Sequence, residues 1–429
     1  MYRISPFICL VMILLTIIIL KTVQRSLKLP RIVWSKETSY SKNSPKNKHG
    51  DLNPEYDEQI EDDADKEYNT STQNSDIRNT TKSWNIKTIL IWNPQYKHSG
   101  MSNITCDNCH CVVTENRSLL NFSSAVIISS NTIMKQYLQK RTFSGLLPNS
   151  RENDQIWIFA SLEAPPSLQM WQTVDEKNEI TKLFNWTMGY HRNSDIWNPY
   201  GYYNGSHIKY KETIIDIKQW SIQPDTNFAE NKTKLVFSAI SNCITSSRRE
   251  VYIHDLQHYT SVDIYGRCGD LFCEQNTSCE DEFYKPYKFY LAFENSICED
   301  YVTEKLWRAL VKWNVVPIVL GGADYETLLP PNSYIDIADF SSTSYLARFL
   351  KMLNENDNLY NQYFMWKFIP EHRDLNTKSE WPLETTFCQI CNKLNSAPMS
   401  NEYFMSLEQV YDKKRYCKKT SKYYDSTLL

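Results

Sequence analysis

The feature that most constrains the fold is an alternation, from Trp84 onward, of short apolar runs with amphipathic stretches of helical period. Short apolar runs bounded by polar or turn-forming residues predict buried strands. The predicted strands are Thr88–Trp92, Ala125–Ile128, Gln155–Ser161, Val236–Ile240, Val262–Tyr265, Phe289–Phe293 and Val315–Leu320. Helical spacing places Leu306, Trp307, Leu310 and Val311 on one face, and Leu346, Phe349, Leu350 and Leu353 on another.

Alternating strands and helices favour an α/β fold with parallel sheets covered on both faces. A body of roughly 290 residues is too long for one small doubly wound sheet, so we expect two Rossmann-like domains. Pro, Asp, Asn and Lys cluster at residues 223–232, where we expect the two domains to join. Because ligands of such sheets bind at the carboxyl ends of the strands, a cleft between the domains is the expected site.

Composition narrows the class of protein. The chain is 41% apolar and 13% aromatic, which is enough for a buried core and excludes disorder of the whole chain. Its 47 basic and 50 acidic side chains give a net charge of −3, which argues against a nucleic-acid partner.

An almost wholly apolar run lies near the N-terminus, FICLVMILLTIIIL. Its length is at the lower limit for a membrane span. Two interpretations compete, a cleaved signal peptide and an uncleaved signal anchor. No small-residue cleavage pattern follows the run, so we favour the anchor. We expect a cytosolic tail at residues 1–6 and a span in the lipid bilayer at residues 7–23.

The sequons give the orientation of this span. Nine N-x-S/T sequons follow it and are candidate glycosylation sites: Asn69, Asn79, Asn103, Asn116, Asn121, Asn185, Asn204, Asn231 and Asn276. Eleven of the twelve cysteines also follow it, as expected in an oxidising compartment. We therefore expect a single-pass type II protein with a luminal body. Because eleven is odd, one thiol is left over or pairs between chains.

Residues 24–83 are predicted to form a disordered luminal stem. The stretch is rich in Asn, Ser, Thr, Lys and acidic residues and poor in large apolar ones, so it cannot offset the entropy of ordering. Its Asp63-Ala-Asp65 triplet has the form of a metal-binding DxD, but we interpret it as part of a solvated acidic run. The body has no other DxD, and we expect no dedicated metal site there.

The most informative stretch of the body is KFYLAFENSICEDYVTEKLWRALVKWNVVPIVLGGAD, residues 288–324. A predicted strand runs straight into Glu294 and Asn295, and Tyr301 to Lys305 open an amphipathic helix. Polar groups at a strand end and at a helix N-terminus favour an anion such as a phosphate. The alternative interpretation is an ordinary capped helix, whose charged side chains are solvated and bind no ligand.

This stretch resembles the donor motif of the α1,3-fucosyltransferases, FxLxFENS…DYxTEKxW…VPVVLG. The resemblance extends over roughly residues 84–395. Further similar segments are Trp157–Pro165 (WIFASLEAP), Phe184–Tyr200 (FNWTMGYHRNSDIWNPY), Val236–Arg248 (VFSAISNCITSSR), Val262–Arg267 (VDIYGR) and Pro330–Phe340 (PPNSYIDIADF). The chain departs from the family at Ala164, in place of a usual Ser, and at His191, where Tyr or Arg is common.

The resemblance implies a GT-B fold. It implies an acceptor-side domain at residues 84–228, a donor-side domain at 229–375, and a C-terminal segment at 376–429 that packs back on the first domain. It also implies a Golgi membrane location and an inverting transfer of L-fucose from GDP-fucose to O3 of a GlcNAc in a glycan. No cofactor is required by this chemistry, and divalent metal is at most a stimulant.

The resemblance further implies residue roles. Glu163 matches the base that takes the acceptor proton, as single-displacement inversion requires. Arg248 and Lys305 would contact the diphosphate and Tyr301 would hydrogen-bond it. Glu304 would bind the ribose. Glu294 and Asn295 would shape the fucose end. Arg249, next to Arg248, is a rival for the phosphate contact.

The cysteines cluster at both ends of the body. Cys106, Cys109 and Cys111 lie at its start, and Cys388 and Cys391 form a C-x-x-C near its end. Such spacing allows zinc, with His110 as a further ligand, but a luminal location favours disulfides. The resemblance implies bridges between the two clusters, one to Cys111 and the other to Cys106 or Cys109.

Two other functions stay open from the sequence. One is a GT-B glycosyltransferase that uses a different sugar nucleotide. The other is a glycan-binding relative without catalytic activity. The sequence does not distinguish the GlcNAc of an N-glycan core from that of an antenna N-acetyllactosamine as acceptor.

Overall fold

The computed structural model describes residues 86–93, 102–106, 109–140, 145–168, 180–203, 226–273, 279, 281–368, 375–377, 383–396 and 411–418. The expected tail, span and stem lie outside these residues, as do Asp63–Asp65 and the sequons at Asn69, Asn79, Asn204 and Asn276. Across the described ranges, no helix is both long enough and apolar enough to cross a membrane.

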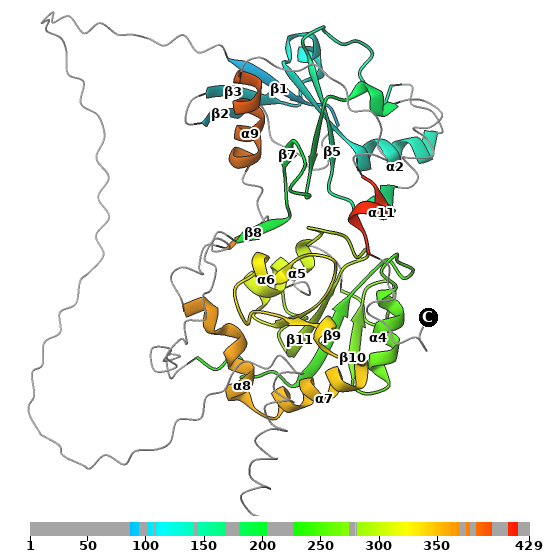
Figure 1. Ribbon diagram of the computed structural model, residues 1–429, viewed down its shortest axis with the longest axis vertical. Coiled ribbons are helices and arrows are strands. Elements are labelled where there is room, and N and C mark those ends of the chain that lie inside the picture. The colour runs from blue at the N-terminus through cyan, green and yellow to red at the C-terminus, as the bar shows by residue number, and fades with distance from the viewer. Residues whose placement is uncertain are drawn as a thin grey trace, which may run out of the picture. The chain divides into compact units, whose positions relative to one another are not determined.

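The first sheet, within the described residues, has seven strands in the order β2-β3-β1-β4-β5-β6-β7 (Figure 1). Its strands are β1 (Lys87–Ile91), β2 (Ser102–Cys106), β3 (Cys109–Thr114), β4 (Ala125–Ser129), β5 (Ile156–Ser161), β6 (Trp186–Gly189) and β7 (Ile196–Trp197). All neighbouring pairs are parallel except β2 with β3.

Both faces of this sheet are covered, as its near-continuous apolar strands require. Helix α2 (Ser130–Lys140) contacts β4 and β5. Helix α9 (Leu383–Asn395) contacts β1, β2, β3 and β7. Alternate residues of β1 divide between the two cores, since Ile89 packs in the cluster that includes Ile390 of α9, whereas Leu90 packs with Ile133 of α2.

The second sheet is parallel throughout, in the order β10-β9-β11-β12-β13. Its strands are β9 (Lys234–Ala239), β10 (Val262–Tyr265), β11 (Tyr287–Phe293), β12 (Val316–Leu320) and β13 (Ile335–Asp336). The central strand β11 is buried along its whole length. Phe289, Leu291 and Phe293 face one core, and Tyr290 and Ala292 face the other.

Shorter elements connect and cover these sheets. The helices are α4 (Arg249–Gln257), α5 (Glu304–Arg308), α6 (Tyr325–Leu328), α7 (Thr343–Asn354), α8 (Asp357–Asn361) and α11 (Lys413–Tyr416). Single 3₁₀ segments are η1 (Arg117–Phe122), η2 (Pro165–Leu168), η3 (Ile180–Leu183), η7 (Ile337–Asp339) and η8 (Gln362–Phe368). Strands β8 (Gly201–Tyr203) and β14 (Leu375–Thr377) form an antiparallel pair.

The seven predicted strands are confirmed, with ends shifted by at most two residues. The helical face of Leu346, Leu350 and Leu353 is also confirmed, because all three are buried in α7. The prediction that Val311 shares the buried helix face with Leu306, Trp307 and Leu310 is wrong, because the Val311 side chain is exposed. Residues Ala309–Trp313 form a π-helical turn, η6, whose wider winding moves Val311 off the buried face.

Disulfides fasten α9 to the first sheet. Cys106 bonds to Cys388 and Cys111 bonds to Cys391. The open choice between Cys106 and Cys109 is thereby decided for Cys106. Cys109 is buried as a thiol whose Sγ lies 3.0 Å from Asn392 Oδ1. The sulfurs of Cys106, Cys109 and Cys391 lie within 4.8 Å of one another, but two of them are in disulfides and are not thiolate metal ligands.

Three further disulfides, which the sequence did not pair, lie in the second half of the body and the C-terminal tail. They join Cys243 to Cys268, Cys273 to Cys279 and Cys298 to Cys417.

The described sequons differ in exposure. Asn103, Asn116, Asn121 and Asn231 are exposed. Asn185 is 7% exposed, and its Oδ1 accepts hydrogen bonds from the Trp157 N–H (2.9 Å) and from Arg151. This burial argues against Asn185 as a glycan acceptor in the folded chain, since a glycan needs open solvent.

Candidate active site

Glu163 lies just beyond the carboxyl end of β5, where ligands of parallel sheets bind. Its N–H donates to Ser161 Oγ at 3.3 Å, and Asn131 Nδ2 lies 3.5 Å from Oε1. Burial raises the pKa of the Glu163 carboxyl, the Lys305 ammonium opposes that rise, and the Glu304 carboxylate adds to it. The charge of Glu163, in the first half, therefore interacts with the charges of two residues of the second half.

Glu294 directly follows the central strand β11 and is 1% exposed. Its carboxylate accepts hydrogen bonds from the Thr303 N–H (2.7 Å) and from the Thr303 hydroxyl (3.0 Å to Oε1). The Lys305 ammonium lies 3.2 Å from Glu294 Oε2. Burial raises the pKa of Glu294, and Lys305 together with Thr303 opposes the rise. A buried carboxylate is held here by three donors, as its desolvation demands.

Lys305 consequently has partners inside the protein. Besides Glu294, its Nζ donates to Thr303 Oγ1 at 2.7 Å and lies 3.7 Å from Glu304 Oε1. Its side chain is 16% exposed, whereas that of Glu304 is 44% exposed. Lys305 thus joins the end of β11 to the start of α5, and its expected contact to phosphate stays a prediction.

The adjacent arginines have different surroundings. Arg249 is 3% exposed, and its Nη1 donates to the Phe293 carbonyl at 2.7 Å and its Nη2 to the Asn242 carbonyl at 3.3 Å. Arg248 is only partly buried, and its guanidinium has no hydrogen bond or ion pair to any described residue. Arg249 is therefore committed to the end of β11, and Arg248 is the cation that the geometry leaves available to a ligand.

Arg248 also holds an unusual backbone conformation. Its φ of 53° is left-handed, and it caps α4 without a side-chain hydrogen bond. The preceding Ser247 is tied down, because its hydroxyl donates to the Glu294 carbonyl at 2.6 Å and its N–H donates to the Asn295 carbonyl at 3.0 Å. These bonds hold the α4 N-terminus against the end of β11.

Tyr301 and Asn295 complete the set of predicted residues. Tyr301 is 2% exposed and its ring lies 4.9 Å from that of Tyr190, centroid to centroid. Burial raises the pKa of Tyr301 well above its usual range, so the phenol stays protonated. The Asn295 side-chain oxygen is buried, and no described residue donates a hydrogen bond to it.

Sequence reasoning missed a polar contact between the two halves. Asp300 accepts a hydrogen bond from the Arg192 N–H at 3.0 Å, and Arg192 Nε lies 3.8 Å from its other oxygen. Asp300 has a left-handed φ of 57°. Both residues lie in segments that carry the family resemblance, but nothing in the sequence pairs positions 108 residues apart.

Sequence reasoning placed the C-terminal segment, residues 376–429, on the first domain but did not pair Cys417 of its tail. The Cys298–Cys417 disulfide attaches it to the loop before Tyr301. Backbone bonds flank this bridge, from the Glu299 N–H to the Tyr416 carbonyl and from the Lys418 N–H to the Ile297 carbonyl, each 2.8 Å. The tail is therefore part of the wall of the site.

Two family models match the body of the chain. Residues 85–201 match the family described as "Fucosyltransferase, N-terminal", and residues 229–410 match "Glycosyltransferase family 10 (fucosyltransferase) C-term". A crystal structure titled α1,3-fucosyltransferase with GDP-fucose is 15% identical, covers 77% of this chain and 96% of its own, and has a TM-score of 0.44.

Named relatives have higher identity. The chain is 36% identical over 302 residues to the human 3-galactosyl-N-acetylglucosaminide 4-alpha-L-fucosyltransferase, covering 69% of this chain and 74% of that protein. It is 34% identical over 321 residues to glycoprotein 3-alpha-L-fucosyltransferase A of Drosophila melanogaster, covering 72% of this chain but only 57% of that protein. The chain therefore belongs to glycosyltransferase family 10, the fucosyltransferases.

Proposed function

We propose that the chain is an inverting α1,3-fucosyltransferase of GT-B type that transfers L-fucose from GDP-fucose to O3 of a GlcNAc in a glycan. One observation carries the proposal most directly. The partly buried carboxylate of Glu163 lies just past the carboxyl end of β5, and its charge interacts with those of Lys305 and Glu304 at the start of α5. Family membership and the names of the relatives support it further.

Glu163 is the proposed base. Inversion by single displacement needs one carboxylate that takes the proton of the attacking hydroxyl. Burial raises the pKa of Glu163, which makes the carboxylate a stronger proton acceptor near working pH than an exposed one. Asn131 Nδ2 at 3.5 Å helps to orient it.

The departing GDP gains negative charge, which cationic side chains can offset. Arg248, whose guanidinium has no described partner, and Lys305 are the proposed diphosphate ligands, with the protonated phenol of Tyr301 as a further donor. The more exposed Glu304 is proposed to accept from the ribose hydroxyls.

Glu294 and Asn295 are proposed to act at the fucose end in different ways. The Glu294 carboxylate is occupied by Thr303 and Lys305, so its role is to position them. The Asn295 side-chain oxygen is buried and has no described donor, so it is free to accept from a fucose hydroxyl.

The donor is tested by hydrolysis and binding across GDP-fucose, other GDP-sugars, UDP-sugars and CMP-sugars. The proposal predicts turnover with GDP-fucose and little with the others. Preference for another nucleotide would indicate a different glycosyltransferase, and binding without turnover would indicate an inactive glycan-binding relative.

We further propose that residues 7–23 anchor the body in the Golgi lumen, with domains at residues 84–228 and 229–375. The apolar run, the exposed sequons and the disulfides support this. Glycosidase digestion should lower the mass of the expressed full chain with its N-terminus still attached. A mature protein beginning near residue 25 would contradict the anchor.

A further inference from the structure

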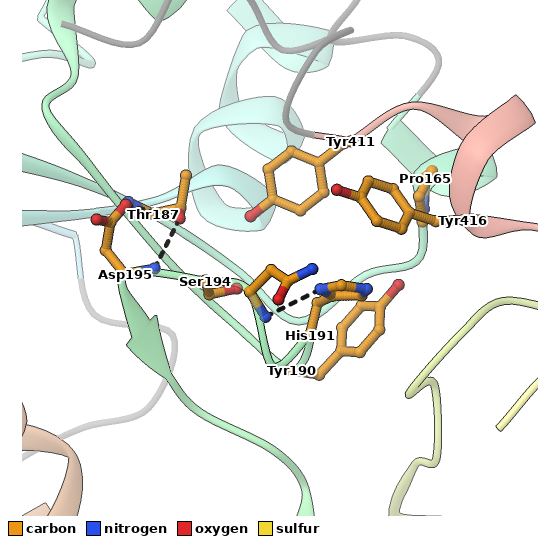
Figure 2. A pocket seen from close by; sticks show the side chains of 9 residues that line it. Pro165, Thr187, Tyr190, His191, Ser194, Asp195, Tyr411 and Tyr416 are labelled. Carbon is orange, nitrogen blue, oxygen red and sulfur yellow. Dashed lines mark hydrogen bonds between the residues drawn. The ribbon is translucent and has the colours of Figure 1, made fainter. Parts of the chain in front are cut away.

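A pocket of about 200 Å³ is lined in part by Pro165, which follows Glu163 by two residues. Segment 187–195 forms one side of it, and the C-terminal tail forms the other (Figure 2). Its aromatic walls are Tyr190, Tyr411 and Tyr416, and we call it the tyrosine pocket. The tail that carries Tyr411 and Tyr416 is bonded through Cys417 to Cys298.

Two buried polar atoms in the pocket have no hydrogen-bond partner among the described residues, the Tyr411 hydroxyl and His191 Nε2. Tyr411 is 5% exposed, and burial raises its pKa well above the usual range, so it presents an O–H. Figure 2 shows this hydroxyl directed toward the side of the pocket formed by Thr187, Ser194 and Asp195. A buried donor left without an acceptor is costly, and a bound ligand would satisfy it.

The histidine also presents a donor. The Asn193 N–H donates to His191 Nδ1 at 3.1 Å, so the ring proton of neutral His191 sits on Nε2. The nearest carboxylate oxygens to Nε2 belong to Asp300 (3.9 Å) and Glu299 (4.0 Å), which is beyond hydrogen-bond distance.

The chemistry of the lining selects the class of ligand. Neither Lys nor Arg lines the pocket, so an anionic ligand is disfavoured. Hydroxyl, imidazole and amide groups between aromatic rings suit a neutral, polyhydroxylated ring, which offers both acceptors and apolar C–H faces.

The pocket adjoins the proposed base. Pro165 lines it two residues after Glu163, and Tyr190 lines it while interacting electrostatically with both Glu163 and Glu294. A glycan whose reacting sugar sits at Glu163 can therefore reach the pocket with a neighbouring sugar.

We propose that the tyrosine pocket binds one neutral sugar residue of the acceptor glycan, next to the GlcNAc that receives fucose. The proposal rests on the proposed function. It makes Tyr411 and His191 determinants of acceptor specificity that have no part in donor binding.

The test uses the substitution Tyr411→Phe, which removes only the hydroxyl. Three probes are compared, the β-glycosides of GlcNAc, of N,N′-diacetylchitobiose and of N-acetyllactosamine. For the disaccharide that the wild type uses best, KM should rise by about 5- to 20-fold in the variant, the effect of one lost hydrogen bond in a buried site. KM for GDP-fucose and kcat/KM for the GlcNAc glycoside should not change.

Thermal unfolding separates this role from a structural one. Because Tyr411→Phe removes an unsatisfied hydroxyl, the unliganded variant should be at least as stable as the wild type. Tyr345→Phe, at an exposed tyrosine of α7, is the matched control. A lower Tm with equal losses on all three probes, or an unchanged ratio of KM values between disaccharide and monosaccharide, would overturn the proposal.

Direct binding keeps the test independent of catalysis. Calorimetric titration of the two disaccharides should show weaker binding to Tyr411→Phe and to His191→Phe than to the wild type. If the wild type transferred fucose to no probe, the proposed function would fail, and these titrations would still decide for or against the pocket.

Discussion

At the scale of single residues, neighbouring side chains of the same type have different tasks. Arg249 donates to two backbone carbonyls at the end of β11, whereas Arg248, partly buried, makes no hydrogen bond or ion pair with the described residues. The sequence offered both as phosphate ligands. The choice depends on the left-handed backbone at Arg248, which no sequence pattern reveals.

Substitution of the two arginines by alanine should therefore have opposite signatures. Arg248→Ala should weaken GDP binding by about 1.5–3 kcal/mol, the range for a charge-assisted contact, and leave Tm unchanged. Arg249→Ala should lower stability, because the Phe293 carbonyl loses its donor. Calorimetry with GDP and thermal melts measure the two effects. Equal loss of GDP binding in both variants with equal melts would contradict the assignment.

The pH dependence of activity is also decided at single residues. Glu163 must be ionised to act as base, and burial raises its pKa, so kcat/KM should fall as pH drops through a value above the usual glutamate range. The Glu304 carboxylate contributes to that rise. Glu304→Gln should therefore shift the acidic limb to lower pH, and Glu326→Gln, at an exposed glutamate of α6, should not. If kcat/KM fell at the same acidic pH in the wild type, Glu304→Gln and Glu326→Gln, Glu163 would not be the titrating group.

At the scale of elements, seven buried strands were predictable because each contains a continuous apolar run, which can be recognised without knowing the neighbouring strand. Strands β2 and β3 were not, since SNITC and CHCVVT mix polar and apolar residues and their pairing is fixed by the fold. The helix was expected to open at Tyr301, whereas α5 begins at Glu304, after the extended Thr303. What the sequence did not show is that Glu294 accepts from the Thr303 N–H at this helix N-terminus.

The Lys305–Glu294 pair is the connection between β11 and α5. Lys305→Met should destabilise the fold by about 3–5 kcal/mol, because it leaves a buried carboxylate without its cation. Adding Glu294→Gln should restore most of that loss, as chemical denaturation would show. If the double variant were as unstable as the single one, the pair would not be the cause.

The disulfides of α9 should act together. They close loops of 282 and 280 residues, so when one is present the other closes only a short additional loop. In a Cys109→Ser background, which prevents exchange with the nearby thiol, Cys388→Ser should cost about 2.5 kcal/mol. Replacing Cys391 as well should bring the loss above about 5 kcal/mol. If denaturant titrations gave the same loss of stability with and without the Cys391 replacement, the Cys111–Cys391 bridge would contribute nothing.

At the scale of the whole molecule, the site is assembled from segments far apart in the chain. Arg192 meets Asp300, Tyr190 meets Tyr301, and the tail is bonded to Cys298. The family resemblance indicated which residues matter, but these contacts depend on the folded body. The same assembly leaves Glu163 within electrostatic reach of Lys305.

The central claim, that Glu163 is the base of the transfer, is tested most directly by Glu163→Gln in single-turnover fucose transfer, with GDP-fucose affinity measured in parallel. The amide keeps the shape of the side chain but cannot take the acceptor proton. The transfer rate should fall by roughly 10²- to 10⁴-fold while donor affinity stays near that of the wild type. Transfer by Glu163→Gln at close to the wild-type rate would contradict the account and place the base on another residue.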